Sequence, residues 1–125
     1  MSTVITAAGA PAAVGPYSHA LQVGNLLFCS GQIPLVAETG VLAEGGIVGQ
    51  TKQMFANVRA VLAAAGMDFS NVVKVTVFMT NLQDFSTLNE IYATYFPENP
   101  PARSCVEVAA LPKGALVEME VIAAQ

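Results

Sequence analysis

The sequence is poor in charged residues and nearly lacks the residues that build metal and disulfide sites. Only 11 % of its 125 residues are charged, whereas an average soluble domain is about 25 % charged. It contains no tryptophan, one histidine, and two cysteines, Cys29 and Cys105. Two separate cysteines make no disulfide framework, and with a single histidine they give no zinc-binding spacing. We therefore expect no structural metal.

Basic residues are scarce as well. Five lysines and arginines stand against nine acidic residues, which gives a net charge of −4, and they form no cluster. Because nucleic acids and anionic membranes are bound by many lysines and arginines, we expect neither as a partner. The apolar runs, at residues 60–65 and 106–111, are far shorter than the roughly 20 residues that cross a bilayer. The first 13 residues lack the features of a signal peptide, so the expected location is cytoplasmic.

Apolar residues are what the chain has in excess. They make up 54 % of it, and the mean hydropathy is +0.54. A chain of this length forms one domain with a real core, but a small monomer has more surface than so few charges can cover. Obligate subunit interfaces are more apolar than other protein surfaces. We therefore predict a single domain over residues 1–125 and an obligate homo-oligomer.

The apolar pattern predicts an α+β domain. Helical spacing over 48–65 and 84–96 predicts two helices, which Gly66 and Pro97 end. Gly24-Asn25 predicts a tight hairpin between the apolar runs on either side of it. β-branched or alternating residues predict six strands, at 3–6, 18–23, 26–30, 72–80, 102–108 and 115–124. We expect a mixed or antiparallel sheet with both helices on one face and the other face free for partner subunits.

The strand that follows Pro100-Pro101 carries the best candidate site. Alternation along it places Arg103, Cys105 and Glu107 on one face. An arginine on a sheet face needs an anionic partner, which is either a carboxylate on the next strand or the carboxylate of a ligand. A four-residue turn joins this strand to the last one, so we expect the two to pair antiparallel. That pairing would bring Glu118 and Glu120 beside Arg103.

Other polar residues each allow two interpretations. Tyr17 follows a stiff turn and is either a core or interface residue or part of a site. His19 on an apolar strand is either a structural residue with its hydrogen bonds satisfied or a base. Ser30-Gly31 is either an ordinary strand exit or a bend where the backbone approaches another group closely. Asn89, beside the apolar stripe of its helix, either caps a loop or reaches a ligand.

Several motifs together resemble the RidA family, also called YjgF or reactive intermediate deaminase. The match runs nearly end to end and keeps the order Gly15-Pro16-Tyr17-Ser18, Ser30-Gly31-Gln32-Ile33-Pro34, Pro101-Ala102-Arg103-Ser104, Glu118-Met119-Glu120. The resemblance implies a chorismate-mutase-like fold and a homotrimer with ligand clefts between its subunits. It also implies cofactor-free hydrolysis of 2-imino acids or their enamine tautomers, such as 2-iminobutanoate and 2-iminopropanoate, to 2-oxo acids and ammonia.

The resemblance also suggests roles for individual residues. Arg103 would bind the substrate carboxylate with help from the backbone amide of Cys105, and Glu118 would position the attacking water. The cleft would be lined by Tyr17, Ser30, Gly31 and Asn89. The family often has an aromatic residue where this chain has Pro100, which affects the shape of the cleft rim.

The alternative from another functional class is a non-catalytic trimer that binds small carboxylates or acts like a chaperone. Relatives have also been credited with RNA cleavage, which the acidic balance of this chain disfavours.

Overall fold

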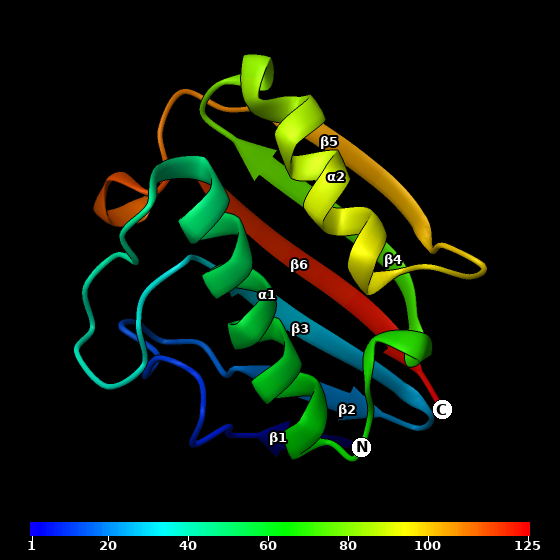
Figure 1. The fold of residues 1–125 in the computed structure, drawn as a ribbon. Coiled ribbons are helices and arrows are strands. Elements are labelled where there is room, and N and C mark those ends of the chain that lie inside the picture. Colours follow the sequence, from blue (N-terminus) through cyan, green and yellow to red (C-terminus); the bar gives the residue numbers. More distant parts are fainter.

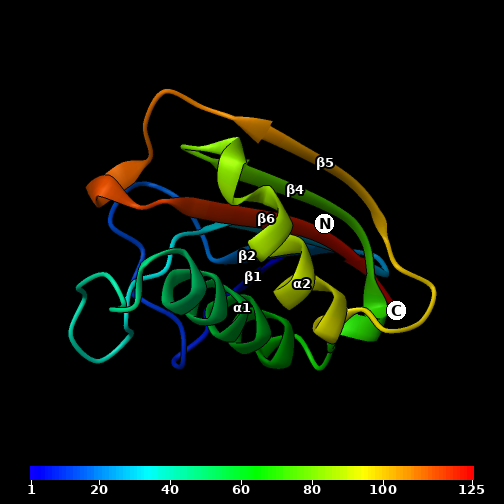
Figure 2. The same ribbon diagram turned by 45° about the horizontal axis from the view of Figure 1, so that its top comes forward.

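Six strands form one mixed sheet, and two helices pack on one of its faces (Figures 1 and 2). The computed structural model describes all residues from 1 to 125. The helices are α1, Gly46–Ala64, and α2, Phe85–Tyr95. The strands are β1 Ser2–Ile5, β2 Ala20–Val23, β3 Leu26–Gln32, β4 Val72–Met79, β5 Ala102–Glu107 and β6 Val117–Ala124. All six predicted strands and both predicted helices are therefore present, with ends shifted by a few residues.

The strands lie in the order β1-β2-β3-β6-β4-β5. The predicted hairpin is confirmed: β2 and β3 pair antiparallel around Gly24, whose φ of +60° suits a glycine. The predicted antiparallel pairing of β5 with β6 is wrong. Instead β5 pairs parallel to β4, and β6 runs between β3 and β4, antiparallel to both. The reason is α2, which joins β4 to β5 and returns the chain in the same direction, as a strand–helix–strand unit does.

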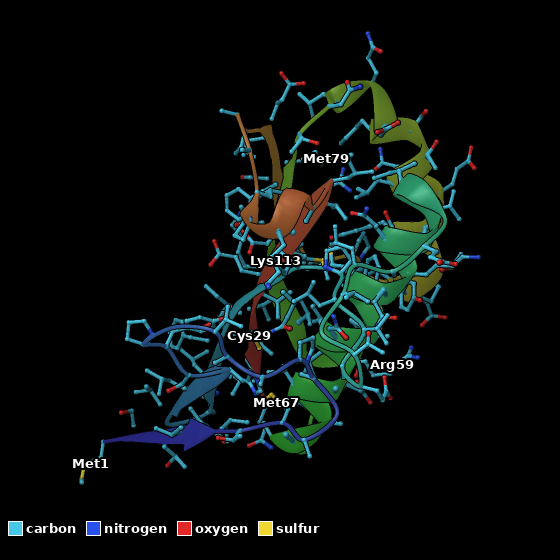
Figure 3. The ribbon with its side chains drawn as sticks, turned by 90° about the vertical axis from the view of Figure 1, so that its left-hand side faces the viewer. Met1, Cys29, Arg59, Met67, Met79 and Lys113 are labelled. Carbon is cyan, nitrogen blue, oxygen red and sulfur yellow. The ribbon has the colours of Figure 1, made fainter.

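The core fills the layer between the sheet and the helices. Alternate residues of the central strand β6 face it and are buried, from Val117 to Ala123. From α1 the core receives Met54, Phe55, Val58, Val61 and Leu62, and from α2 Leu88 and Tyr92. In Figure 3, Cys29, Met67 and Met79 mark side chains of this layer, whereas Arg59 is exposed on α1. No helix of the chain has the length and apolar character that crossing a bilayer requires.

The face of the sheet opposite the helices is uncovered (Figure 2). It is defined by the strand residues that alternate with the core residues, and we call it the open face. Several of its side chains are large, apolar and exposed, namely Leu21, Val23, Leu26, Phe28 and Val106. An apolar exposed surface of this kind is typical of a protein–protein contact.

Candidate functional site

Arg103 lies on the helix side of the sheet and is held by α2. Its register partner on β4 is Val75, a fully buried core residue. The Nη1 atom of Arg103 donates a hydrogen bond to Oδ1 of Asn89, at 2.7 Å. The guanidinium carbon lies 4.6 Å from the ring centroid of Tyr92 and 5.4 Å from that of Phe85. Its contacts are thus an amide and two rings, so they leave its positive charge uncompensated.

Helix α2 brings these three contacts together through its periodicity. Phe85, Asn89 and Tyr92 are spaced four and three residues apart, and such residues share one side of a helix. Asn89 was expected to cap a loop or reach a ligand, and its observed partner is Arg103. Neither Phe85 nor Tyr92 was singled out as a site residue in the sequence. The signal that could have identified them is that both rings lie on the side of the helix that carries Asn89.

Cys105 follows Arg103 on the same face of β5. Its Sγ lies 3.6 Å from Sδ of Met79, and the side chain is partly buried. Burial raises the pKa of the Cys105 thiol, and the nearby positive charge of Arg103 offsets only part of this effect. A thiol with a raised pKa is protonated at neutral pH and is a poor nucleophile.

A second group of predicted residues lines a hollow on the open face. Tyr17, Ser30, Gly31 and Glu118 surround a cavity of about 430 Å³, together with Val14, Ile33, Pro112 and Glu120. Ser30 Oγ donates a hydrogen bond to the carbonyl oxygen of Ser18, at 2.6 Å. Tyr17 is 46 % exposed, so the core of a single chain does not account for it.

Gly31 permits a close approach, as the sequence suggested. A Cβ atom built on Gly31 would lie 2.9 Å from Cδ of Glu118 and 3.0 Å from its Oε2. Real Cβ atoms essentially never have a contact shorter than 3.0 Å. Glycine at this position therefore lets the Glu118 carboxyl lie against the backbone of β3.

The electrostatics of Glu118 suit a proton acceptor. Partial burial raises the pKa of its carboxyl, and the neighbouring Glu120 carboxylate raises it further. A carboxylate with a raised pKa binds a proton more readily than an ordinary surface carboxylate does.

The two groups lie on opposite faces of the sheet. On β4, Arg103 pairs with Val75 and Glu118 pairs with Phe78, and residues three apart on a strand point to opposite faces. The expectation that Glu118 and Glu120 lie beside Arg103 is therefore wrong for a single chain. We call the residues Arg103, Cys105 and Asn89 the arginine half-site, and Tyr17, Ser30, Gly31 and Glu118 the glutamate half-site.

His19 belongs to neither half-site. It is buried, and its Nδ1 accepts a hydrogen bond from the backbone N–H of Ala7 at 2.9 Å. Its Nε2 then carries the proton and donates to the carbonyl oxygen of Pro11 at 2.8 Å. Both ring nitrogens are engaged, which confirms the structural interpretation. No group of three or more His, Cys, Asp or Glu side chains is placed to hold a metal ion.

Comparison with known proteins extends over almost the whole chain. Residues 7–125 match the family described as Endoribonuclease L-PSP. The mouse 2-iminobutanoate/2-iminopropanoate deaminase is 51 % identical over 122 residues, which are 98 % of this chain and 90 % of the mouse protein.

Two solved structures have the same fold. A protein of the Rid family from Yersinia pestis superimposes with a TM-score of 0.95 at 50 % identity, covering 100 % of both chains. The structure of E. coli TdcF with bound serine gives a TM-score of 0.94 at 40 % identity, covering 98 % of both chains. The predicted chorismate-mutase-like α+β fold is confirmed by these likenesses.

Proposed function

The chain belongs to the endoribonuclease L-PSP family, which is the family of the RidA proteins, and on this premise we propose that it hydrolyses 2-imino acids to 2-oxo acids and ammonia. The substrates we propose are 2-iminobutanoate and 2-iminopropanoate, which are those in the name of the mouse relative. The observation that carries the proposal is that Arg103 is held by an amide and two rings, which leaves its charge for a ligand carboxylate.

In the proposed mechanism, Arg103 binds the substrate carboxylate through charge-assisted hydrogen bonds, which contribute roughly 1.5–3 kcal/mol. Glu118 takes a proton from a water molecule as the water oxygen attacks the imine carbon. Glu118 returns this proton to the imine nitrogen, which gives a neutral tetrahedral carbinolamine. As the C–N bond breaks, Glu118 takes the proton of the new hydroxyl group and passes it to the departing nitrogen, so that the 2-oxo acid and ammonia are released. Holding water and substrate in this geometry supplies several kcal/mol of the rate enhancement.

The proposed site requires two copies of the chain, because its halves lie on opposite faces of the sheet. The glutamate half-site of one subunit would face the arginine half-site of the next. A contact between two different surfaces repeats head to tail and closes into a ring, and the family resemblance favours a ring of three. Exposed apolar residues of the open face, such as Leu21, Phe28 and Val106, would supply the interface.

Other features of the chain weigh on the alternatives. RNA cleavage, which the family's description names, is the weaker candidate, since the chain has a net charge of −4 and its one histidine is fully engaged. The serine bound to TdcF favours a second candidate, a trimer that binds small carboxylates without acting on them.

We propose the cytoplasm as the compartment, since both cysteines are free thiols.

The test couples the purified protein to a threonine dehydratase and follows the release of 2-oxobutanoate. The dehydratase alone measures the spontaneous hydrolysis of the imine. We expect the protein to accelerate release above this rate, and Arg103→Ala to remove the acceleration. Absence of acceleration, with 2-oxobutanoate still bound at Arg103, would favour the binding protein instead.

A further inference from the structure

We propose that α2 presets the Arg103 guanidinium for a carboxylate, through three positioning residues that we call the cradle: Phe85, Asn89 and Tyr92. The inference rests on the proposed function, because it concerns how the same site selects its ligand. The cradle acts through Arg103 and is not itself required to touch the substrate.

The contacts of the cradle hold the guanidinium while leaving most of its donors free. A guanidinium has five N–H groups, and only Nη1 is used, in the 2.7 Å bond to Asn89. The ring faces of Phe85 and Tyr92 attract the guanidinium cation without accepting a conventional hydrogen bond from its N–H groups. They are about two helical turns apart, so the guanidinium lies between them along α2. The remaining N–H groups can bind a flat, two-oxygen anion.

One side of the cradle is anchored in the core. The ring of Tyr92 packs against Phe55 at 6.0 Å and Phe96 at 4.8 Å between ring centroids. Phe55 is fully buried, and Tyr92 is only 7 % exposed. A side chain whose contacts are fixed before binding loses less freedom when the ligand arrives, so the cradle favours binding by ordering Arg103 in advance.

The ring of Tyr92, and not its hydroxyl, holds Arg103 in place. The hydroxyl is buried and has no hydrogen-bond partner. An unsatisfied buried polar atom is destabilising, so Tyr92→Phe should keep both the fold and the cradle. Tyr92→Leu removes the ring and with it the contact to Arg103.

Helix α2 also offers a matched control. Tyr95 belongs to the same aromatic cluster, where it stacks on Phe55 at 4.0 Å, but the arginine it contacts is Arg59, at 5.5 Å. Tyr95→Leu therefore removes a similar ring from the same helix and leaves Arg103 unaffected.

The experiment measures binding of 2-oxobutanoate by calorimetry and kinetics in the dehydratase-coupled assay. For Tyr92→Leu we expect the dissociation constant and KM to rise roughly 3- to 30-fold with little change in kcat. Tyr92→Phe and Tyr95→Leu should stay within about twofold of the wild type in the same measurements. The neutral 2-oxobutanamide should bind weakly to the wild type and respond to none of the changes.

Asn89→Asp separates positioning from packing. The aspartate has the same shape as asparagine and keeps the contact to Arg103, but it neutralises the guanidinium. Carboxylate binding should therefore fall at least about tenfold while the thermal melting temperature is maintained. If Asn89 only packed, this isosteric change would leave carboxylate binding unchanged.

Three outcomes decide the matter. Unchanged binding in Tyr92→Leu and Asn89→Asp, or an equal loss in Tyr95→Leu, would overturn the cradle alone. A wild type that neither binds 2-oxobutanoate nor speeds imine hydrolysis would remove the proposed function and the cradle with it. If Tyr92→Leu does not fold, the half-buried Phe85 replaces it, and Phe85→Leu should show the same selective rise in KM.

Discussion

Arg103 and Glu118 project from opposite faces of one sheet, on strands that both pair with β4. The edge strand β5 carries the arginine toward α2, and the central strand β6 carries the glutamate toward the open face. A reaction that uses both groups on one small substrate needs a second copy of the chain.

Mixed oligomers test this arrangement. Arg103→Ala and Glu118→Gln should each be nearly inactive, but a mixture assembled from both contains sites with one intact half from each variant. If each site takes its two halves from neighbouring subunits, random assembly in equal amounts restores about a quarter of the wild-type activity. The measurement is the dehydratase-coupled rate of the whole population of co-expressed oligomers, without selection for mixed ones. Activity no higher than that of the separate variants would place both groups in one subunit.

Cys105 should be dispensable for the chemistry, because its thiol is protonated and packs against Met79. We expect Cys105→Ala to keep substantial activity, whereas Arg103→Ala should lose roughly 10- to 160-fold, since it removes a charge-assisted carboxylate contact. The comparison uses the same coupled assay. A similar loss in both variants would contradict these roles.

Gly31→Ala should reduce activity without unfolding the protein. The new methyl group would collide with the Glu118 carboxyl at 2.9 Å, and the glutamate must then move. Misplacing a reacting group by about 1 Å can cost roughly 100-fold in rate. The checks are kcat and the melting temperature, compared with those of Gly9→Ala, where the new Cβ atom would meet no atom closer than 3.4 Å. Full activity in Gly31→Ala would mean that the observed position of Glu118 is not required.

The acid limb of the pH–rate profile should report Glu118. It accepts a proton only when ionised, so activity should fall as the pH drops through its raised pKa. Glu120→Gln removes the smaller of the two causes of this shift and should move the acid limb to lower pH. The measurement is kcat/KM against pH, corrected for spontaneous imine hydrolysis. If the acid limb lies at the same pH in Glu120→Gln as in the wild type, this would argue against Glu118 as the base.

The contribution of Glu118 to the stability of the fold should change with pH in the sense opposite to its contribution to activity. Because its pKa is higher in the folded than in the unfolded chain, the folded state favours the protonated form. Its favourable contribution is complete below the unfolded pKa of about 4.3 and is lost as pH rises through the folded pKa. Glu118→Gln should therefore melt at a higher temperature than the wild type near pH 7, and the difference should vanish near pH 4. A less stable variant at neutral pH would contradict this sign.

His19→Ala should damage the fold and not the chemistry. The change leaves the N–H of Ala7 and the carbonyl oxygen of Pro11 without the hydrogen bonds that His19 makes to them. Losing such buried partners destabilises by about 1–3 kcal/mol for each group left unsatisfied. Denaturant unfolding measures this loss, and kcat of the folded fraction should be close to that of the wild type.

Local patterns were sufficient to predict the elements but not their pairing. The helical spacing that ends at Gly66, the Gly24-Asn25 turn and the β-branched run of β4 are signals carried by neighbouring residues. The partner of a strand is a long-range property. The short connection between β5 and β6 suggested a hairpin, but the return path through α2 gave β5 a parallel partner and left β6 for the centre of the sheet.

The candidate site was predicted in pieces for the same reason. Motifs identified Arg103, Glu118 and Gly31 one at a time, but which of them share a face depends on the strand order. The rings of Phe85 and Tyr92 escaped notice because aromatic residues at helical spacing usually indicate packing alone. Only the position of Arg103 over both rings reveals their second role.

The open face has a consequence for how the amount of this protein controls its action. Glu118 shares that face with Phe28 and Leu21, so the proposed chemistry and the tendency to self-associate are built on the same surface. Below the concentration at which the chains associate, each chain would contain every required group and still be inactive. The rate of imine hydrolysis would then rise steeply above a threshold amount of the protein and would not simply be proportional to that amount.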